Sequence, residues 1–219
     1  DDKILTQKIY GIVSYDAGGA EILNSWVLKN KKKKFIFSLK GSAIKIYKKK
    51  LFIKKNYNLK ELVKKSDEII TSTSWPNNLE YNALKLAKKL NKKTYSYIDH
   101  WCNYQERFIR KKKLILPDEI WVGDVYAYRL AKKKFKKIKI KLKKNQIFKN
   151  LKKKKINKFS NQLLYLSSPV IIKNNDGIFN FKYFMKKYKN LNFNFSKIIL
   201  RPHPREKISK YKFFEKKYK

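Results

Sequence analysis

Short apolar runs that alternate with stretches of helical spacing restrict this chain, more than any other feature, to an α/β fold. Within residues 68–121 the chain reads as strand, helix, strand, polar loop and strand. Strands that alternate with helices in this way form parallel sheets with helices packed on their faces. We therefore predict a Rossmann-like sheet, with strands at residues 8–14, 35–39, 68–71, 94–98, 119–122 and 138–142.

The strand-and-helix pattern breaks off and restarts beyond a stretch rich in Lys and Asn. We predict an N-terminal Rossmann-like domain over residues 1–143, a linker over 144–160 and a second Rossmann-like domain over 161–219. Two strands, at 162–166 and 197–200, flank an aromatic helix in the second pattern. Because the chain stops within a further helical pattern, we expect this second domain to be incomplete.

The formal net charge of +41 is large, but it does not by itself identify the kind of partner that the protein binds. Lysine supplies nearly all of it, whereas arginine, which suits bidentate phosphate and base contacts, occurs only five times. Lys, Asn, Ile, Phe and Tyr are abundant together, a bias typical of AT-rich coding sequences. We interpret the charge as compositional, with functional charge as the alternative. Nucleic acid is then expected to bind only non-specifically, and anionic membrane surfaces to be contacted peripherally.

Cysteine content and hydropathy exclude several other classes. Cys102 is the only cysteine, so neither an intramolecular disulfide nor a cysteine-based zinc site can form. No apolar run approaches the about 18 residues that span a bilayer, and no signal-peptide pattern follows the first residue. The expected location is cytoplasmic, with peripheral contact with the inner membrane face.

Polar side chains follow the first and fourth predicted strands, and parallel sheets bind ligands at such strand ends. Asp16 and the pair Gly18 and Gly19 follow the first strand, where glycine lets the backbone approach a phosphate at a helix N-terminus. Asp99 and His100 follow the fourth strand. Structural interpretations stay open: a tight turn for the glycines, a turn or helix-capping carboxylate for Asp16, and a hydrogen-bonded corner for the segment beginning at Asp99.

Two further pairs receive structural interpretations only. Asn77 and Glu80 have the spacing of a helix N-cap and a carboxylate that reaches back to it, although Asn replaces the usual Ser or Thr. Glu106 and Arg107 are predicted to lie in a polar helix after the loop, and we do not expect them to be catalytic.

Arg201-Pro202-His203-Pro204 is the most specific short motif in the chain. A predicted strand leads into it and a predicted helix follows, so the motif aims a guanidinium, an imidazole and a helix N-terminus at one place. Such a combination is a natural receptor for an anion. The structural alternative is a rigid strand-to-helix turn that carries an incidental histidine.

The R-x-H-P form of this motif resembles the nucleotide-binding segment of GT-B glycosyltransferases. It is nearest in form to the CDP-glycerol glycerophosphotransferase-like group and to the bacterial sialyltransferase and capsule-polysaccharide groups. The resemblance implies that His203, together with Arg201, contacts the phosphate of the donor nucleotide. The run Ser167-Ser168-Pro169 similarly resembles the S/T-x-P loop that lies beside the nucleotide in that family.

The same resemblance implies two Rossmann-like domains in a GT-B-like arrangement, with no bound metal and no cofactor. The partners it implies are a nucleotide-activated sugar and a surface polysaccharide or lipid-linked acceptor, between which a glycosyl or glycerophosphate-type group is transferred. Transfer needs a base that removes the proton of the acceptor hydroxyl. Asp16 is one candidate for that base, and Asp99 or His100 is the other.

Three other functions are compatible with the same sequence. A sugar-nucleotide epimerase of this fold would act on the donor itself, a basic nucleic-acid-binding protein would use the charge, and a partial homologue would be inactive. Three aromatic residues can either stack on a sugar ring or fill the core: Trp75, Trp101 and Tyr104.

Overall fold

The computed structural model of the chain describes residues 7–74, 77–147, 161–167, 177–188, 190, 195–203 and 206–217. The chain divides into two compact units, Asp1–Lys152 and Lys153–Lys219, and each is described by itself. Most of the predicted linker, residues 148–160, lies outside the described residues.

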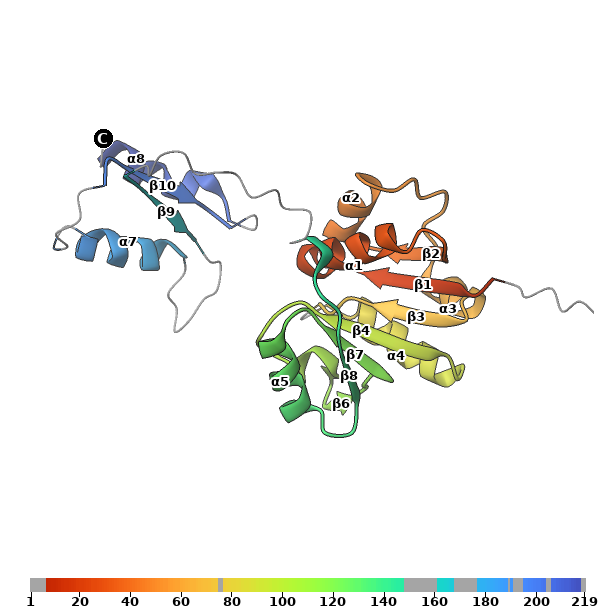
Figure 1. The fold of residues 1–219 in the computed structure, drawn as a ribbon. Helices are drawn as coiled ribbons and strands as arrows, with labels where there is room; N and C mark the ends of the chain where they lie inside the picture. The colour runs from red at the N-terminus through yellow and green to blue at the C-terminus, as the bar shows by residue number, and fades with distance from the viewer. Residues whose placement is uncertain are drawn as a thin grey trace, which may run out of the picture. The chain divides into compact units, whose positions relative to one another are not determined.

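Six parallel strands form the sheet of the first unit (Figure 1). Their order is β2-β1-β3-β4-β7-β8, and each neighbouring pair is parallel. The predicted α/β class with a parallel sheet is therefore confirmed for this unit. The strands are β1 (Ile9–Ser14), β2 (Lys34–Leu39), β3 (Glu68–Thr71), β4 (Lys93–Ile98), β7 (Glu119–Val122) and β8 (Lys139–Leu142).

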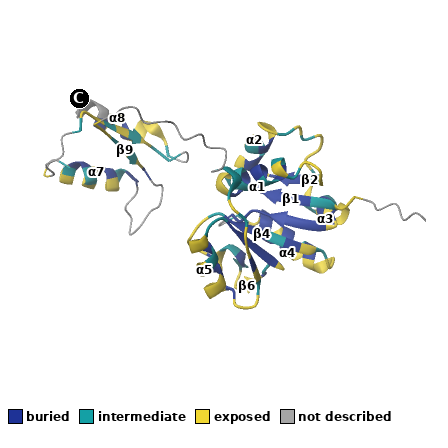
Figure 2. Cartoon of the chain, in the orientation of Figure 1, coloured by how far each residue is buried: buried dark blue, intermediate teal, exposed yellow. Residues whose placement is uncertain are grey.

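Helices cover both faces of this sheet. The helices α1 (Ala17–Lys29) and α2 (Ser42–Lys48) pack on one face, and α3 (Leu59–Lys65), α4 (Leu79–Lys89) and α5 (Val125–Lys134) pack on the other. Because both faces are covered, β3 and β7 are buried at every position (Figure 2). Among the helices of the described residues, none combines the length and apolarity needed to cross a membrane.

The helices α5 and α4 begin differently. Asp124 accepts a hydrogen bond from the Ala127 N–H at 2.8 Å and is the N-cap of α5. At α4 the N-cap position is Asn78, so the predicted position is off by one residue, but the Asn77 side chain does accept a hydrogen bond from the Leu79 N–H at 2.7 Å. The Glu80 carboxylate does not reach back along its own helix, and its partners lie on other elements.

The strand order creates a topological switch point beside β1. The chain leaves β1 for β2 on one side, then passes back to β3 on the other side and continues away from it. The helix α1 and the helix α3 accordingly lie on opposite faces of the sheet. Open α/β sheets bind ligands outside the carboxyl ends of the strands at such a point. The loops after β1 and β3 therefore hold the position of interest.

The second unit contains one strand-helix-strand repeat. The strands β9 (Gln162–Leu166) and β10 (Lys197–Arg201) pair in parallel, and α7 (Gly177–Tyr188) connects them in sequence. Alternate strand residues are exposed and the others are half-buried, so one side of the pair packs against a small core. That core consists of Phe181, Met185, Tyr211 and Phe214, with the last two supplied by a 3-10 turn (Ile208–Tyr211) and by α8 (Lys212–Lys217).

A short hairpin follows β4 where the sequence predicted none. A three-residue 3-10 helix (Glu106–Phe108) replaces the predicted polar helix, and β5 (Ile109–Arg110) and β6 (Lys113–Leu114) then pair antiparallel. Lys111 and Lys112 form the two-residue loop, with φ of +47° and +61°. Hairpin loops with two positive φ angles normally carry Asn-Gly, and the absence of that signal explains why the hairpin was missed.

The positive φ angles of Lys111 and Lys112 predict a stabilising double substitution. We expect Lys111→Asn combined with Lys112→Gly to raise the free energy of unfolding by about 1 kcal/mol, because both residues tolerate the left-handed region better than lysine. Urea denaturation measures the change. The matched control is the double alanine variant, which removes the same two charges but keeps the unfavourable backbone; an equal gain in that variant would contradict the explanation.

Candidate functional site

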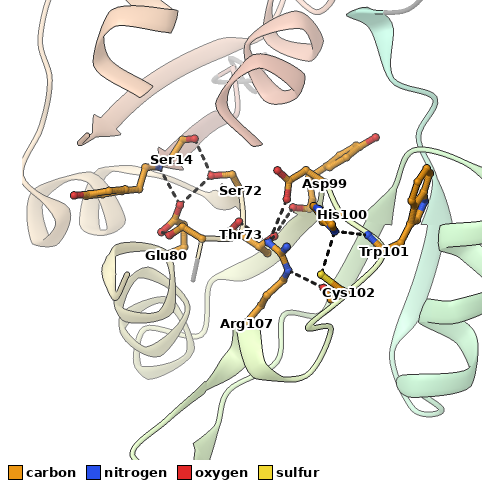
Figure 3. A network of polar contacts seen from close by, with 12 residues as sticks. Ser14, Ser72, Thr73, Glu80, Asp99, His100, Trp101, Cys102 and Arg107 are labelled. Atoms are coloured by element: carbon orange, nitrogen blue, oxygen red, sulfur yellow. Dashed lines mark hydrogen bonds and ion pairs between the residues drawn. The ribbon is translucent and has the colours of Figure 1, made fainter. Parts of the chain in front are cut away.

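Asp99 and Arg107 form an ion pair at the carboxyl edge of the first unit's sheet (Figure 3). Asp99 directly follows β4, and its Oδ1 lies 3.2 Å from Nη1 of Arg107. The two side chains are only 15% and 10% exposed, respectively. A pair this far removed from water is strongly destabilising to break, because either charge alone would remain buried.

Arg107 also ties the loop after β4 to the loop after β3. Its Nη1 donates to the backbone oxygen and to Oγ1 of Thr73, at 3.0 and 3.1 Å, and its Nε donates to the Cys102 oxygen at 3.4 Å. Sequence reasoning missed this role, since Arg107 belongs to the segment predicted as a polar helix. The sequence signal that could have indicated this ion pair is an arginine a few residues after an aspartate at a strand end.

Opposing influences act on the pKa of Asp99, and burial is the largest of them. Burial raises the pKa of Asp99 above its ordinary value of 3.8, and the Arg107 guanidinium opposes that rise. The carboxylate of Asp16 adds to the rise, so the two predicted carboxyl groups lie within electrostatic reach of each other. A strand-end carboxyl group with a raised pKa is suited to accept a proton from a hydroxyl group.

Gly18 and Gly19 bring α1 close to the loops that follow β3 and β4. Both lie in the first turn of α1, so the interpretation as a tight turn is wrong. A Cβ atom on Gly18 would lie 2.4 Å from Oδ2 of Asp99, and one on Gly19 would lie 2.5 Å from Cβ of Ser72. Glycine is therefore required here for close packing, and it places the positive end of the α1 dipole beside the Asp99 carboxylate.

Asp16 precedes α1 at the N-cap position, but its side chain makes no capping hydrogen bond. The interpretation of Asp16 as a helix-capping carboxylate is therefore wrong. Its backbone oxygen instead accepts the hydrogen bond from the Ala20 N–H at 3.0 Å, as the first helical turn requires. The half-buried Asp16 side chain remains a candidate for interaction at this edge.

His100 lies on the exposed rim of the same edge. Its Nδ1 accepts a hydrogen bond from the Trp101 N–H at 3.0 Å and lies 3.2 Å from Sγ of Cys102. The Trp101 indole, 63% exposed, donates to Asp124 at 3.0 Å. Tyr104 is instead buried in the core. Trp101 is therefore exposed enough to stack on a ligand and Tyr104 is not, whereas Trp75 lies outside the described residues.

Glu80 is a buried carboxylate that joins three elements below this edge (Figure 3). Its Oε1 accepts hydrogen bonds from the Tyr15 N–H and from Oγ of Ser72, both at 3.0 Å. Its Oε2 accepts a hydrogen bond of 2.5 Å from Oγ of Ser74. Ser72 also contacts Oγ of Ser14 at 2.7 Å, so the ends of β1, β3 and α4 form one network.

In the second unit, the predicted donor-side residues meet at the carboxyl ends of β9 and β10. The Ser167 N–H donates to the Arg201 oxygen at 3.1 Å, which places the two strand ends side by side. The His203 N–H donates to Oε2 of Glu206 at 2.9 Å. Tyr211 donates to Oε1 of Glu206 at 2.8 Å, and its oxygen lies 2.7 Å from Oγ of Ser167.

Glu206 fills this turn with an internal negative charge, which sequence reasoning did not predict. Partial burial raises its pKa, but hydrogen bonds from the His203 N–H, Ser167 and Tyr211 outweigh that effect, and the pKa of Glu206 is lowered. The turn therefore stabilises an anion. Two predicted neighbours, Ser168 and Pro204, lie outside the described residues.

The structure thus gathers Asp16, Gly18, Asp99 and His100 in the first unit, and Ser167, Arg201 and His203 in the second. Among the described residues, no group of three or more His, Cys, Asp or Glu side chains has the arrangement of a metal site. No protein-family model matches the chain, and no curated protein matches it.

The buried position of Glu80 predicts a pH-dependent contribution to stability. Burial raises the pKa of Glu80 above its ordinary value of 4.5, so the folded protein binds this proton more readily than the unfolded chain. The contribution of Glu80 to the free energy of unfolding therefore falls as the pH rises from 4.5 to the raised pKa of the folded state. Urea denaturation of the wild type and of Glu80→Gln across this range should show that fall in the wild type alone.

Two further variants sharpen this test. Glu21→Gln removes a carboxylate whose side chain is 40% exposed, and we expect its stability to follow the wild-type pH dependence. Glu80→Ala leaves the Tyr15 N–H and two hydroxyl groups without their acceptor and should lower the free energy of unfolding by at least about 2 kcal/mol. Parallel pH curves for the wild type and Glu80→Gln would contradict the assigned burial effect.

Proposed function

We propose that this chain serves glycosyl transfer of the GT-B type, from a nucleotide-activated donor to a surface polysaccharide or lipid-linked acceptor. In this proposal the second unit binds the donor phosphate and the first unit supplies the base on the acceptor side. The observation that carries the proposal is the meeting of Ser167, Arg201 and His203 at one pair of parallel strand ends. Fold class alone would not be sufficient, since Rossmann-like sheets support many activities.

The hydrogen bonds that the Glu206 carboxylate accepts support the proposal that the turn at His203 binds an anion. A carboxylate that accepts hydrogen bonds from a backbone N–H and two hydroxyl groups occupies the kind of environment that a phosphate oxygen prefers. A donor phosphate would take over some of these donors and add the Arg201 guanidinium, which is exposed at the end of β10. Glu206 would then be displaced.

The environment of Asp99 supports its assignment as the acceptor-side base. Asp99 follows β4, the strand next to β3 and to the switch point; its pKa is raised by burial, and its Oδ2 faces the first turn of α1. In the proposed step the carboxylate accepts the proton of the acceptor hydroxyl while that oxygen bonds to the anomeric carbon. The bond from that carbon to the donor phosphate breaks, and the nucleotide leaves with the electron pair. Asp16 and His100 are the neighbouring alternatives.

Nucleotide binding tests the donor side of the proposal. We expect one of CMP, CDP, UDP and GDP to bind the wild type in isothermal titration calorimetry, and His203→Ala and Arg201→Ala each to weaken that binding at least about tenfold. The matched control is His100→Ala, which removes the other histidine of the chain and should leave the affinity unchanged. Equal affinity in the wild type and His203→Ala would remove His203 from the site.

A substitution of Glu206 should strengthen nucleotide binding, in contrast to the substitutions of His203 and Arg201. Because its carboxylate competes with the donor phosphate, Glu206→Gln should bind the same nucleotide several-fold more tightly, with the largest gain at low salt. A loss of affinity in Glu206→Gln would indicate that the carboxylate positions the turn and does not compete for it.

Product analysis separates transfer from epimerisation. A transferase releases free nucleotide only when acceptor is present, whereas an epimerase converts the donor sugar without acceptor. We expect Asp99→Asn to lower acceptor-dependent release by about 10²–10⁴-fold while nucleotide affinity is retained. Full turnover by Asp99→Asn would exclude Asp99 as the base.

A further inference from the structure

A basic loop that begins at the end of α2 exposes an aromatic side chain that the proposed reaction does not use. The basic loop, residues 48–55, reads Lys-Lys-Lys-Leu-Phe-Ile-Lys-Lys. Phe52 at its centre is 95% exposed, the largest exposure among the large apolar side chains in the described part of the chain. Figure 2 shows this loop alternating between intermediate and exposed colours beyond α2.

The fold holds Phe52 in this exposed position. Leu51 and Ile53, on either side of it, pack against the core between the sheet and α1. The Leu51 N–H also donates to the Tyr47 oxygen at 2.9 Å, and Tyr47 is fully buried. At the other end, Asn56 exchanges two hydrogen bonds with the backbone of Leu39, at 2.8 and 3.0 Å. The loop is thus fixed on both sides, and Phe52 projects outward between two anchored neighbours.

The charged side chains of the sequence segment around Phe52 are all positive. Residues 22–60 contain thirteen lysines and no Asp or Glu. Lys50 pairs with Glu21 at 3.0 Å, and Lys55 pairs with Glu61 at 2.9 Å, so each end of the basic loop meets one carboxylate from another element. In the described residues, no ion pair involves the three remaining lysines of the loop, which are Lys48, Lys49 and Lys54.

We propose that the basic loop docks the protein on anionic lipid bilayers, with Phe52 entering the acyl region and Lys48, Lys49 and Lys54 contacting the lipid head groups. An aromatic side chain held in water gains free energy when it enters an apolar phase. The lysines around it are attracted by the negative surface potential of the bilayer. An apolar side chain flanked by basic residues is typical of segments that bind membranes peripherally.

The composition of the loop favours a bilayer over other anionic partners. Single-stranded nucleic acid binds several aromatic rings along a basic groove, whereas the basic loop offers one ring between aliphatic neighbours. A second copy of the chain would bring equal positive charges together, which is unfavourable at close range. The proposal stands independently of glycosyl transfer, because it concerns only partition between water and membrane.

Vesicle co-sedimentation tests the proposal with the whole chain. Against vesicles of phosphatidylcholine with about one-third phosphatidylserine, we expect Phe52→Ala to lower the partition coefficient about tenfold. Phe52→Leu, which keeps an apolar tip, should retain most of the binding. The matched control is Phe213→Ala, which truncates another exposed phenylalanine beside a lysine and should bind as the wild type does.

The contribution of the lysines is tested in the same vesicle assay. We expect a triple alanine variant of Lys48, Lys49 and Lys54 to lower the partition coefficient about fivefold for each lysine removed. The matched control is a triple alanine variant in α4, at Lys85, Lys88 and Lys89, which should have a smaller effect. Equal partition of Phe52→Ala and Phe213→Ala would overturn the proposal. So would a single-stranded oligonucleotide whose affinity depends on Phe52 more strongly than vesicle binding does.

Discussion

A buried carboxylate holds the carboxyl edge of the six-stranded sheet together. Glu80 accepts hydrogen bonds from the backbone after β1 and from two serines after β3, although it belongs to the first turn of α4. Burying an ionisable group is unfavourable unless its oxygens are satisfied, and here donors from the strand ends satisfy both of them. The position of the loops that carry the candidate residues therefore depends on this one side chain.

Above this network, the candidate site is arranged by close backbone approach and by one ion pair. The two glycines of α1 let the helix approach Asp99 and Ser72 at distances that any side chain would prevent. Arg107 then holds Asp99 from the opposite side and attaches it to the loop after β3. The Arg107 guanidinium lowers the pKa of Asp99, but burial has the larger effect and keeps that pKa raised. Such a balance allows a carboxyl group to exchange a proton during a reaction.

The sequence predicts the six strands of the first unit's sheet and the strand-end position of the site residues, because apolar periodicity and strand-end polarity are local signals. It misassigns Glu80, since the N-cap spacing is local while the partner Tyr15 lies 65 residues away in the chain. It misses Arg107 because the 3-10 turn and hairpin that position this residue carry no Asn-Gly signal. Glu206 escapes for a similar reason: its role depends on tertiary contacts with Ser167 and Tyr211. Interactions between distant segments are what local patterns cannot encode.

The proposed division of function assigns the nucleotide to the second unit and the acceptor chemistry to the first. Amide chemical shifts, followed by NMR while the bound nucleotide is titrated, test this division most directly. The account predicts that the shifts of Ser167, Arg201, His203 and Glu206 change together, while those of Gly18, Gly19 and Asp99 stay constant. Changes centred on Gly18 and Gly19, with none at the carboxyl ends of β9 and β10, would contradict it.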